Sequence, residues 1–439
     1  MSDLPRGWEL PNIADAGETR LGKQRAPKWH TGPNMRPYLR VANVFEDRID
    51  VSDVKSMHFE PHEVVTFELR PGDVLLNEGQ SPEFLGRPAI YRGELPGVCF
   101  TNSLVRFRPY PGVLSEWALT VFRHHMHSGR FRTESQITTN IAHLSLGRLN
   151  TVEFPLPPTA EQRRIVAAIE EQFSRLDAAD ASLGNVPQRL NRFRQSLLRD
   201  AFDIGWDRVP ITAVTSAERV IRYGILKPGK DVARGVPVVK VRDYPQGEIR
   251  VDSLSRTTPE ISARFEAATL RPGDVLISIR GTYGRVAPVP DVLDRANITQ
   301  DSARIAPLPS IHRGFLVHFL RSPECQSFLR RVARGVAVKG VNIRDLRQLP
   351  VPVPDLATQA RVAEKLDDQL SLHGHLSGEL AKARRATRVL RLSILAAGFS
   401  GQLVSQDPND EPSVVLLERI RAEQATTTLS KRKQKATSL

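Results

Sequence analysis

The chain has 439 residues, of which 40% are hydrophobic and 25% charged, and its 62 Lys+Arg against 49 Asp+Glu give a formal net charge of +13. This length suits two to four domains, and the near-average composition excludes a wholly disordered, collagen-like or rod-shaped coiled-coil protein. Two cysteines exclude a disulfide framework and a cysteine-rich zinc cluster. With no signal-like N-terminus and no apolar run of ~18 residues, we expect a soluble, cytoplasmic protein.

The positive charge is concentrated in one central block. Residues 1–155 contain 18 basic and 18 acidic side chains, whereas residues 206–354 contain 24 and 14. A local excess of this kind is typical of a protein that binds a polyanion, most often nucleic acid. A surface that only keeps the protein soluble explains it equally well.

The sequence contains an internal repeat with a spacing near 200 residues. The heptapeptide LRPGDVL at residues 69–75 recurs letter for letter at 270–276, and Gln162 is matched by Gln359. The matched segments keep their order, and their offset drifts by only four residues, from 197 to 201. We infer a tandem duplication, whose period is too long for a solenoid.

The first copy begins with a mixed α/β region. Short apolar runs at 64–69, 73–76 and 104–108, bounded by turn residues, predict strands. The segment 117–128 has the periodicity of a helix.

A proline-marked boundary follows, after which Thr159 can cap a helix that we expect to continue to about residue 203. An apolar side chain recurs there every seven residues, the pattern of a coiled-coil seam. Gly184 and Pro187 predict a kink in this helix rather than two stacked helices. The residues of the apolar series are Ile169, Leu176, Leu183, Leu190 and Leu197.

The second copy repeats this order. Strands are expected over 236–241, 274–279 and 303–308, and a helix over 315–333. The helical region that follows can be capped by Asp355, and its apolar seam is weaker because His373 and Thr387 interrupt it.

We therefore predict an α+β fold: two mixed α/β domains separated by two long helical regions that form an antiparallel coiled coil with an internal pseudo-twofold repeat. A helix of this length spans ~65 Å, enough to hold two DNA-reading domains at separate half-sites. Because the copies have diverged, the expected target is bipartite and asymmetric. The predicted segments are 1–154 and 205–351 for the two mixed domains, 155–204 and 352–402 for the helical regions, and 403–439 for a C-terminal segment with a disordered basic tail from Lys431.

Catalytic and metal-binding motifs are absent from the sequence. Residues 17–24 imitate a phosphate-binding loop but end in Gln24, a poor ligand for Mg²⁺, and no strand leads into them. Asp73 and Asp274 follow Pro-Gly in both copies, where turn chemistry explains them. We expect no catalytic residue and no metal site in this chain.

Residues suited to DNA contact are present in both copies, on loops and next to the repeated strand. Arginine and lysine serve both phosphate contacts and hydrogen bonds to guanine. For any one of them a solvated surface charge explains the position as well, but the set favours DNA binding. The candidate DNA-binding residues are Arg20, Lys23, Arg25, Lys28, Arg87, Arg219, Arg222, Tyr223, Lys227, Lys230, Arg280, Tyr283, Arg285 and Lys339.

Two boundary motifs carry a family resemblance. They are PLPP at 155–158 followed by EQRRIV at 161–166, and PVP at 352–354 followed by QARV at 359–362. With these motifs and the stretch 403–412, the chain resembles, over nearly its whole length, the specificity subunit (HsdS) of type I restriction–modification systems. It departs from the pattern at Thr358, where the family usually has glutamate; we expect a weaker helix cap or subunit contact there.

The resemblance implies two target-recognition domains and no catalytic activity or bound cofactor in this chain. It implies two methyltransferase subunits (HsdM) that use S-adenosylmethionine to modify adenine, and motor–nuclease subunits (HsdR) that use ATP and Mg²⁺ to cleave DNA. The exposed helical faces would be their docking surface, with Arg163, Arg164, Glu170 and Glu171 among the residues.

Three other functions stay open from the sequence. A free-standing regulator would bind a bipartite site without a partner, although the net-neutral first domain gives it little electrostatic affinity. A fused nuclease or methyltransferase would need motifs that we do not find. A pure scaffold would leave sequence choice unchanged when residues 1–150 are replaced.

Overall fold

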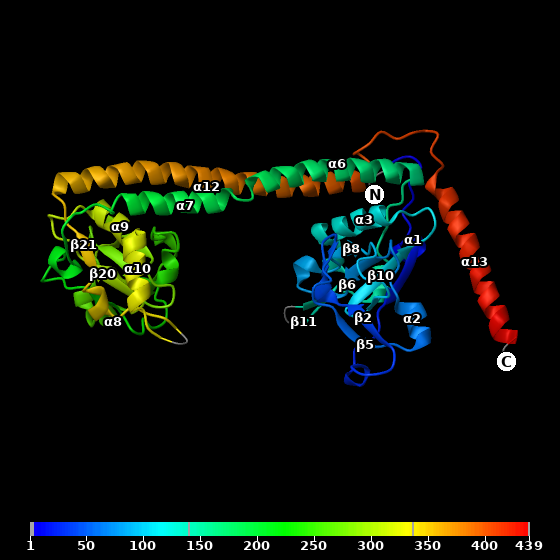
Figure 1. Cartoon of the computed structure of the whole chain (residues 1–439), viewed down its shortest axis with the longest axis horizontal. Helices are drawn as coiled ribbons and strands as arrows, with labels where there is room; N and C mark the ends of the chain where they lie inside the picture. The colour runs from blue at the N-terminus through cyan, green and yellow to red at the C-terminus, as the bar shows by residue number, and fades with distance from the viewer. Residues whose placement is uncertain (1–3, 139–140, 336–337, 438–439) are drawn as a thin grey trace. The chain divides into compact units, whose positions relative to one another are not determined.

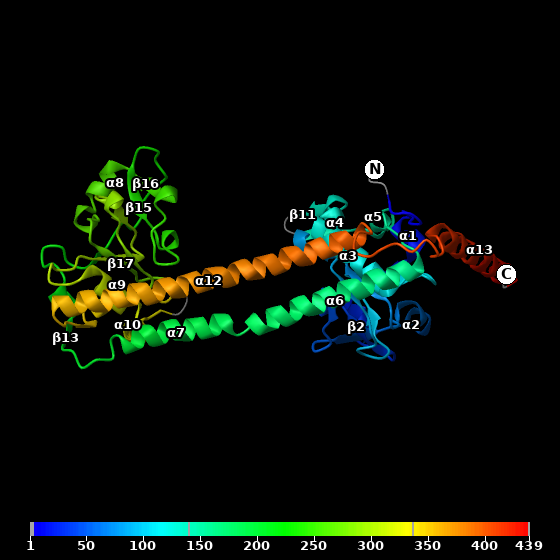
Figure 2. The same cartoon turned by 90° about the horizontal axis from the view of Figure 1, so that it is seen from above.

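The computed structural model describes residues 4–138, 141–335 and 338–437 (Figure 1). The chain forms two compact units. The first unit comprises residues 1–182 and 383–439, and the second unit comprises residues 183–382. Each combines a mixed α/β domain with parts of the long helices (Figures 1 and 2).

The central sheet of the first unit has four antiparallel strands in the order β1-β10-β6-β8. They are β1 (Gly17–Leu21), β10 (Leu104–Pro109), β6 (Val74–Asn77) and β8 (Pro88–Ile90). The middle strands are buried, which agrees with their apolar sequence. The smaller sheets are β5 (Lys55–His58), β2 (Met35–Leu39) and β9 (Cys99–Phe100); β11 (Gln136–Thr138), β12 (Ile141–His143) and β7 (Gly79–Gln80); and β3 (Val44–Phe45) with β4 (Arg48–Ile49).

Helices cover the sheet of the first unit, and Trp117 on α3 (Ser115–Ser128) is fully buried in its core. One prediction fails here, because residues 64–67, expected as a strand, belong to α2 (Pro61–Phe67). Pro61 at the helix start and Glu63 in the first turn favour the helix, which exposes Val65. The remaining short helices are α1 (Ile13–Ala16), α4 (Arg130–Thr133) and α5 (Leu146–Asn150).

The second unit repeats the strand order of the first. Its main sheet is β14 (Arg222–Tyr223), β20 (Ser302–Ile305), β17 (Val275–Ser278) and β18 (Val286–Pro288), in that order. The strand expected over 303–308 thus ends at Ile305. The smaller sheets are β16 (Ser255–Thr257), β15 (Val236–Val239) and β19 (Asn297–Ile298), and β13 (Arg208–Pro210) with β21 (Pro350–Pro352).

The helix expected over 315–333 is two helices, α9 (Arg313–Arg321) and α10 (Pro323–Val332). Ser322 separates them because its hydroxyl caps α10 and the following proline occupies the first turn. The second unit also contains α8 (Pro259–Ala263) and α11 (Ile343–Leu346).

The first long helical region also divides in two. We expected one kinked helix, but α6 (Thr159–Leu183) ends before Gly184 and α7 (Val186–Asp200) begins after Asn185. Pro187 explains the break, since its ring cannot donate to the carbonyl of residue 183. The second region is one helix of 44 residues, α12 (Leu356–Phe399).

The long helices pack into the core of each unit. In the first unit, Ile165 and Ile169 of α6 join Ile394 and Leu395 of α12 in one hydrophobic core. In the second unit, Leu198 of α7 joins Ala363 and Leu366 of α12. The helices are therefore part of the folded units, and the coiled coil itself stays a prediction.

The repeated glutamines make the same three hydrogen bonds. The Oε1 of Gln162 accepts from the Leu114 amide at 2.9 Å, and that of Gln359 accepts from the His312 amide at 2.8 Å. Each Nε2 donates to the carbonyl of the proline five residues earlier and to a second carbonyl in the loop before α3 or α9. Each glutamine thereby ties its helix to its α/β domain.

The repeated aspartates occupy turns, as predicted. The Oδ2 of Asp73 accepts from the Arg70 amide, and that of Asp274 accepts from the Arg271 amide, both at 2.8 Å. At the second boundary Thr358 keeps the helix cap, because its amide and hydroxyl both donate to Asp355. Its counterpart, Glu161, is buried.

The C-terminal segment folds onto the first unit. Helix α13 (Ser413–Thr437) buries Leu416, Leu417 and Ile420 in its core. The helix continues past Lys431, where we expected a disordered tail, because residues 413–437 contain no glycine or proline. Over the described residues, every helix is too short or too polar to traverse a bilayer.

Candidate nucleic-acid interface

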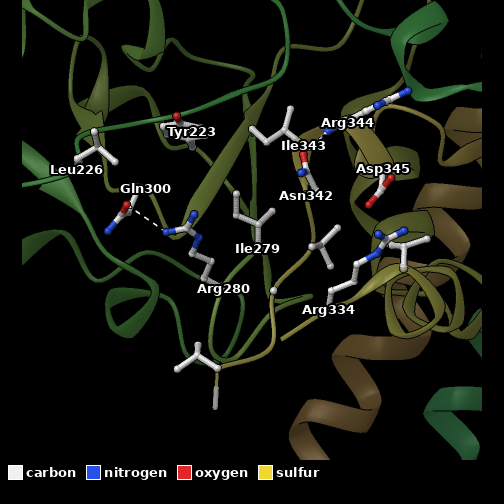
Figure 3. A pocket seen from close by; sticks show the side chains of 14 residues that line it. Tyr223, Leu226, Ile279, Arg280, Gln300, Arg334, Asn342, Ile343, Arg344 and Asp345 are labelled. Atoms are coloured by element: carbon white, nitrogen blue, oxygen red, sulfur yellow. Dashed lines mark hydrogen bonds between the residues drawn. The ribbon is translucent and has the colours of Figure 1, made fainter. Parts of the chain in front are cut away.

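An open pocket of about 870 Å³ lies in the second unit at one edge of its main sheet (Figure 3). Four pieces of chain form it: strand β14 with the loop after it, the segment after β17, Gln300 before β20, and residues 332–335 and 338–345, which include the start of α11. The polar side chains that line it are Tyr223, Arg280, Gln300, Arg334, Asn342, Arg344 and Asp345.

Backbone pairing sets the positions of two of these arginines. Arg280 lies two residues after the buried end of β17 at Ser278, and it forms a bridge with Gly340. Arg334 pairs with the same glycine from the other side. Two guanidinium groups that are 54 residues apart are therefore held at one edge of the sheet.

The pocket has a positive charge and several hydrogen-bond donors. Arg280 Nη1 donates to Gln300 Oε1 at 3.2 Å (Figure 3), which fixes the direction of the guanidinium. Arg334 and Arg344 are exposed and, among the described residues, form no ion pair. Asn342 Oδ1 accepts from the Arg344 amide at 2.9 Å and caps α11. Such donors suit a base edge or a phosphate.

The structure places some of the predicted residues of the second unit in or beside this pocket. Tyr223 and Arg280 line it. Lys339 is exposed between two lining residues, and its carbonyl accepts from the Gly281 amide at 3.1 Å. Lys227 and Lys230 are exposed on the loop after β14.

Other predicted residues of the second unit are engaged within the fold. Arg219 makes two hydrogen bonds of 2.7 Å to Asp274. Arg285 Nη1 donates to the Val241 carbonyl at 3.2 Å, and Tyr283 packs against the hydrophobic core. Arg222 is exposed and lines a different pocket, described below.

In the first unit, Lys23 has a structural role instead of the predicted DNA contact. Its ammonium is buried and donates to the His58 carbonyl at 2.8 Å and to Glu63 Oε2 at 2.5 Å. It also lies 3.9 Å from the centre of the Trp29 ring. A buried, fully paired ammonium is not available to DNA, so we remove Lys23 from the candidates.

Arg87 and Arg20 are also bound within the first unit. The Arg87 guanidinium lies over the rings of Phe45 and Phe84, and burial lowers its pKa. Arg20 is exposed but pairs with Glu18 at 2.9 Å.

Arg25 and Lys28 are exposed on the loop between β1 and β2. Their cationic groups lie over the rings of Tyr38 and Trp29, at 5.8 and 4.6 Å from the ring centres. Among the predicted contacts of the first unit, these two are exposed and have no ion pair within the described residues.

Five polar residues of the pocket are not among the residues predicted from the sequence. They belong to a basic stretch in which the sequence predicts only Lys339, and to the chain segment before β20. The excess charge of residues 206–354 is the available signal, but it does not say which arginines share one pocket. The five residues are Gln300, Arg334, Asn342, Arg344 and Asp345.

The described residues contain no cluster of three or more His, Cys, Asp or Glu side chains able to hold a metal ion. Both cysteines are buried, and burial raises the pKa of Cys99 to about 12 and that of Cys325 further. Such thiols are poor nucleophiles at neutral pH.

The chain is similar to proteins of known function. Residues 225–380, which include every lining residue of the pocket except Tyr223, match the type I restriction modification DNA specificity domain. The specificity subunit of the Escherichia coli type I restriction enzyme EcoBI is 28% identical over 322 residues, covering 66% of this chain and 68% of that protein. The EcoKI specificity subunit of Escherichia coli strain K12 is 22% identical over 468 residues, covering 96% of both chains.

The chain is thus similar to the specificity subunits of type I restriction–modification systems.

Solved structures share the fold of this chain. A chain from a study of assembly and conformational transition of the type I restriction–modification system matches with a TM-score of 0.74 at 20% identity, covering 92% of this chain and 100% of that one. The HsdS subunit of Thermoanaerobacter tengcongensis matches with a TM-score of 0.54 at 20% identity, covering 91% and 98%.

Proposed function

We propose that this specificity subunit directs a type I restriction–modification complex to a bipartite, asymmetric DNA site, and that each α/β domain reads one half-site. The observation that carries the proposal is the basic pocket of the second unit, all of whose lining residues except Tyr223 belong to the segment matching the DNA specificity domain. Arginine can pair with the O6 and N7 atoms of guanine, and asparagine with the N6 and N7 atoms of adenine. Arg280, Arg334 and Asn342 supply these groups.

Different side chains at equivalent positions support two different half-sites. In the second unit Arg280 pairs with Gly340. In the first unit the corresponding pair is Gly79 with His143. The second unit therefore has a guanidinium, that of Arg280, on one side of this pair. The first unit has an imidazole, that of His143, on the other side. The two domains thus present different hydrogen-bonding groups to DNA.

Exposed lysines and arginines in both α/β domains are suited to phosphate contacts. They are Arg25 and Lys28 in the first unit and Lys227, Lys230 and Lys339 in the second. Each phosphate that they neutralise steepens the slope of log K against log salt concentration by roughly 0.9. DNA binding by the complex should therefore weaken strongly with salt.

We also propose the division of labour of the family. Two methyltransferase subunits (HsdM) would dock on the long helices and methylate adenine with S-adenosylmethionine, and motor–nuclease subunits (HsdR) would cleave DNA with ATP and Mg²⁺. This chain would supply recognition without a catalytic group. Arg163 and Glu170 are exposed on α6 and suit a docking surface, whereas Arg164 pairs with Asp410.

The test is a genome-wide methylation map of the host with and without the gene. We expect adenine methylation to disappear at one split, asymmetric motif when the gene is removed. An unchanged map in a strain that expresses the methyltransferase subunit would contradict the proposal.

A further inference from the structure

A second open pocket of the second unit, about 890 Å³ in volume, is lined by five arginines. It lies beside β14 and β20, and its lining does not include the polar residues of the pocket in Figure 3. The five arginines are Arg219, Arg222, Arg271, Arg295 and Arg304.

Arg304 is the unusual member of this set because it is 1% exposed. Its Nη2 donates to the Val220 carbonyl at 2.9 Å, and its Nε is buried without a hydrogen-bond partner. No carboxylate among the described residues forms an ion pair with it. Burial, followed by the charge of Arg219, lowers the pKa of Arg304 to about 10. A buried charge without a counter-ion is unfavourable.

The first unit shows how the same position is neutralised. Arg106 lies opposite Arg20 in the pairing of β10 with β1, as Arg304 lies opposite Arg222 in the pairing of β20 with β14. Arg106 Nη2 donates to Glu18 Oε1 at 3.0 Å, and Arg20 binds the same carboxylate. One internal carboxylate therefore serves both arginines of the first unit.

The second unit lacks this carboxylate. Glu18 stands two residues before Arg20, and the residue two positions before Arg222 is Val220, which lines the pocket.

The nearby acidic groups do not replace the carboxylate. Asp274 accepts two hydrogen bonds from Arg219 and one from the Arg271 amide. Three further carboxylates line the pocket without pairing with Arg222 or Arg304 in the described structure: Glu218, Glu266 and Asp294.

We propose that this pocket binds an external phosphate group, which takes the place of the Glu18 carboxylate between Arg222 and Arg304. Guanidinium groups bind phosphate oxygens through paired, charge-assisted hydrogen bonds. The phosphate can come from the DNA backbone or from a soluble phosphate compound, since both present the same oxygens. The inference does not depend on the proposed function.

Equilibrium dialysis of the full chain against radiolabelled inorganic phosphate tests the pocket, with chloride used to hold the ionic strength constant. Val220→Glu supplies the missing carboxylate internally, and we expect it to weaken phosphate binding at least about tenfold. The matched control, Val65→Glu, makes the same change at an exposed valine of the first unit and should leave binding unchanged.

Arg304→Met provides a second variant that removes the buried charge and keeps an apolar stem, and it should also abolish the site. Thermal unfolding of each variant shows that it is folded before the dialysis is interpreted. The proposal is overturned if the wild-type chain retains no phosphate, or if folded Val220→Glu and Arg304→Met chains retain as much as the wild type.

Adding unlabelled duplex DNA distinguishes the sources of the phosphate. If DNA releases the label from the wild-type chain, the pocket takes a backbone phosphate. If the label remains bound in the presence of DNA, the pocket takes a soluble phosphate compound. Both results support the site, and neither requires a methyltransferase subunit or a recognised sequence.

Discussion

Arg280 follows the buried end of β17, and the side-chain amide of Gln300 holds its guanidinium at the pocket edge. Lys23 carries the same charge but is buried against Glu63 and Trp29. The two residues look alike in the sequence, where each is a cation in a loop-rich segment. Their partners differ. Gln300, 20 residues from Arg280, leaves that guanidinium able to contact DNA. Glu63, 40 residues from Lys23, binds that ammonium inside the fold.

Arg280→Ala is expected to relax sequence choice at one base pair of one half-site. Losing a paired contact to a base costs about 1–3 kcal/mol of discrimination against the wrong base. Competition binding of the assembled complex with duplexes that differ at single base pairs measures this. Arg313→Ala, at an exposed arginine outside the pocket, is the control. An equal loss of affinity for every duplex would instead show that Arg280 contacts phosphate.

His125 makes the first unit sensitive to acid. Burial lowers its pKa to about 4, and its Nε2 hydrogen-bonds to the Glu153 carbonyl at 2.9 Å. As the pH falls below the ordinary histidine pKa of about 6.5, the unfolded chain takes up a proton before the folded chain does, so stability is lost between about pH 6.5 and 4. The pKa of Glu46 is about 2, so this carboxylate does not titrate in the same window.

Urea unfolding at pH 7 and pH 5 tests whether His125 causes this loss of stability. Between these two pH values, the free energy of unfolding of the wild type should fall by about 2 kcal/mol more than that of His125→Gln. Glutamine keeps a donor for the Glu153 carbonyl but does not titrate. Equal losses for the two proteins would exclude His125 as the acid-sensitive group.

At the scale of elements, the repeated glutamines connect each long helix to its domain. Gln359→Ala would leave the His312 amide and two carbonyls without their partner, and an unsatisfied buried group costs about 1–3 kcal/mol. We expect a loss of this size in the free energy of unfolding of the second unit. Gln188→Ala, on the exposed side of α7, should change it by less than about 0.5 kcal/mol. Similar losses for both variants would refute the role of Gln359.

The sequence predicts elements well where one local signal acts alone. The Pro-Gly-Asp turns and the strands that follow them are found as expected, because the turn chemistry of Asp73 and Asp274 is local. The segment 64–69 is apolar and β-branched, yet Pro61 and Glu63 start a helix that includes residues 64–67. Pro187 ends the helical hydrogen-bonding series, although the seven-residue pattern continues through it.

The site is less predictable from the sequence, because only the folded chain brings distant residues together in one pocket. The sequence predicts Arg280 from its place after the repeated strand, and Tyr223 from its place in the stretch that corresponds to the early basic segment of the first copy. Arg334 and Arg344 become neighbours of Arg280 only through the bridges of Gly340 and the start of α11. Those contacts are not encoded at any fixed spacing.

At the scale of the whole molecule, two units with the same strand orders present different side chains. The duplication supplies two domains of one architecture, and divergence at positions such as Gly79 and Arg280 gives each its own chemistry. On this account the chain chooses the site and its partners modify it.

Incubating the purified chain with radiolabelled S-adenosylmethionine and host DNA tests whether recognition and methylation belong to different subunits. The purified chain should transfer no methyl group to DNA alone, and transfer should begin when the methyltransferase subunit is added. Methyl transfer by the chain alone would contradict its assignment as a recognition subunit.

The most direct test of the central claim is a methylation map of a host that carries Arg280→Ala combined with Arg334→Ala in place of the wild-type chain. If each domain reads its own half-site, the half of the motif read by the second unit will relax or change, and the other half will keep its sequence. A change in both halves, or methylation of the unchanged wild-type motif, would contradict the account.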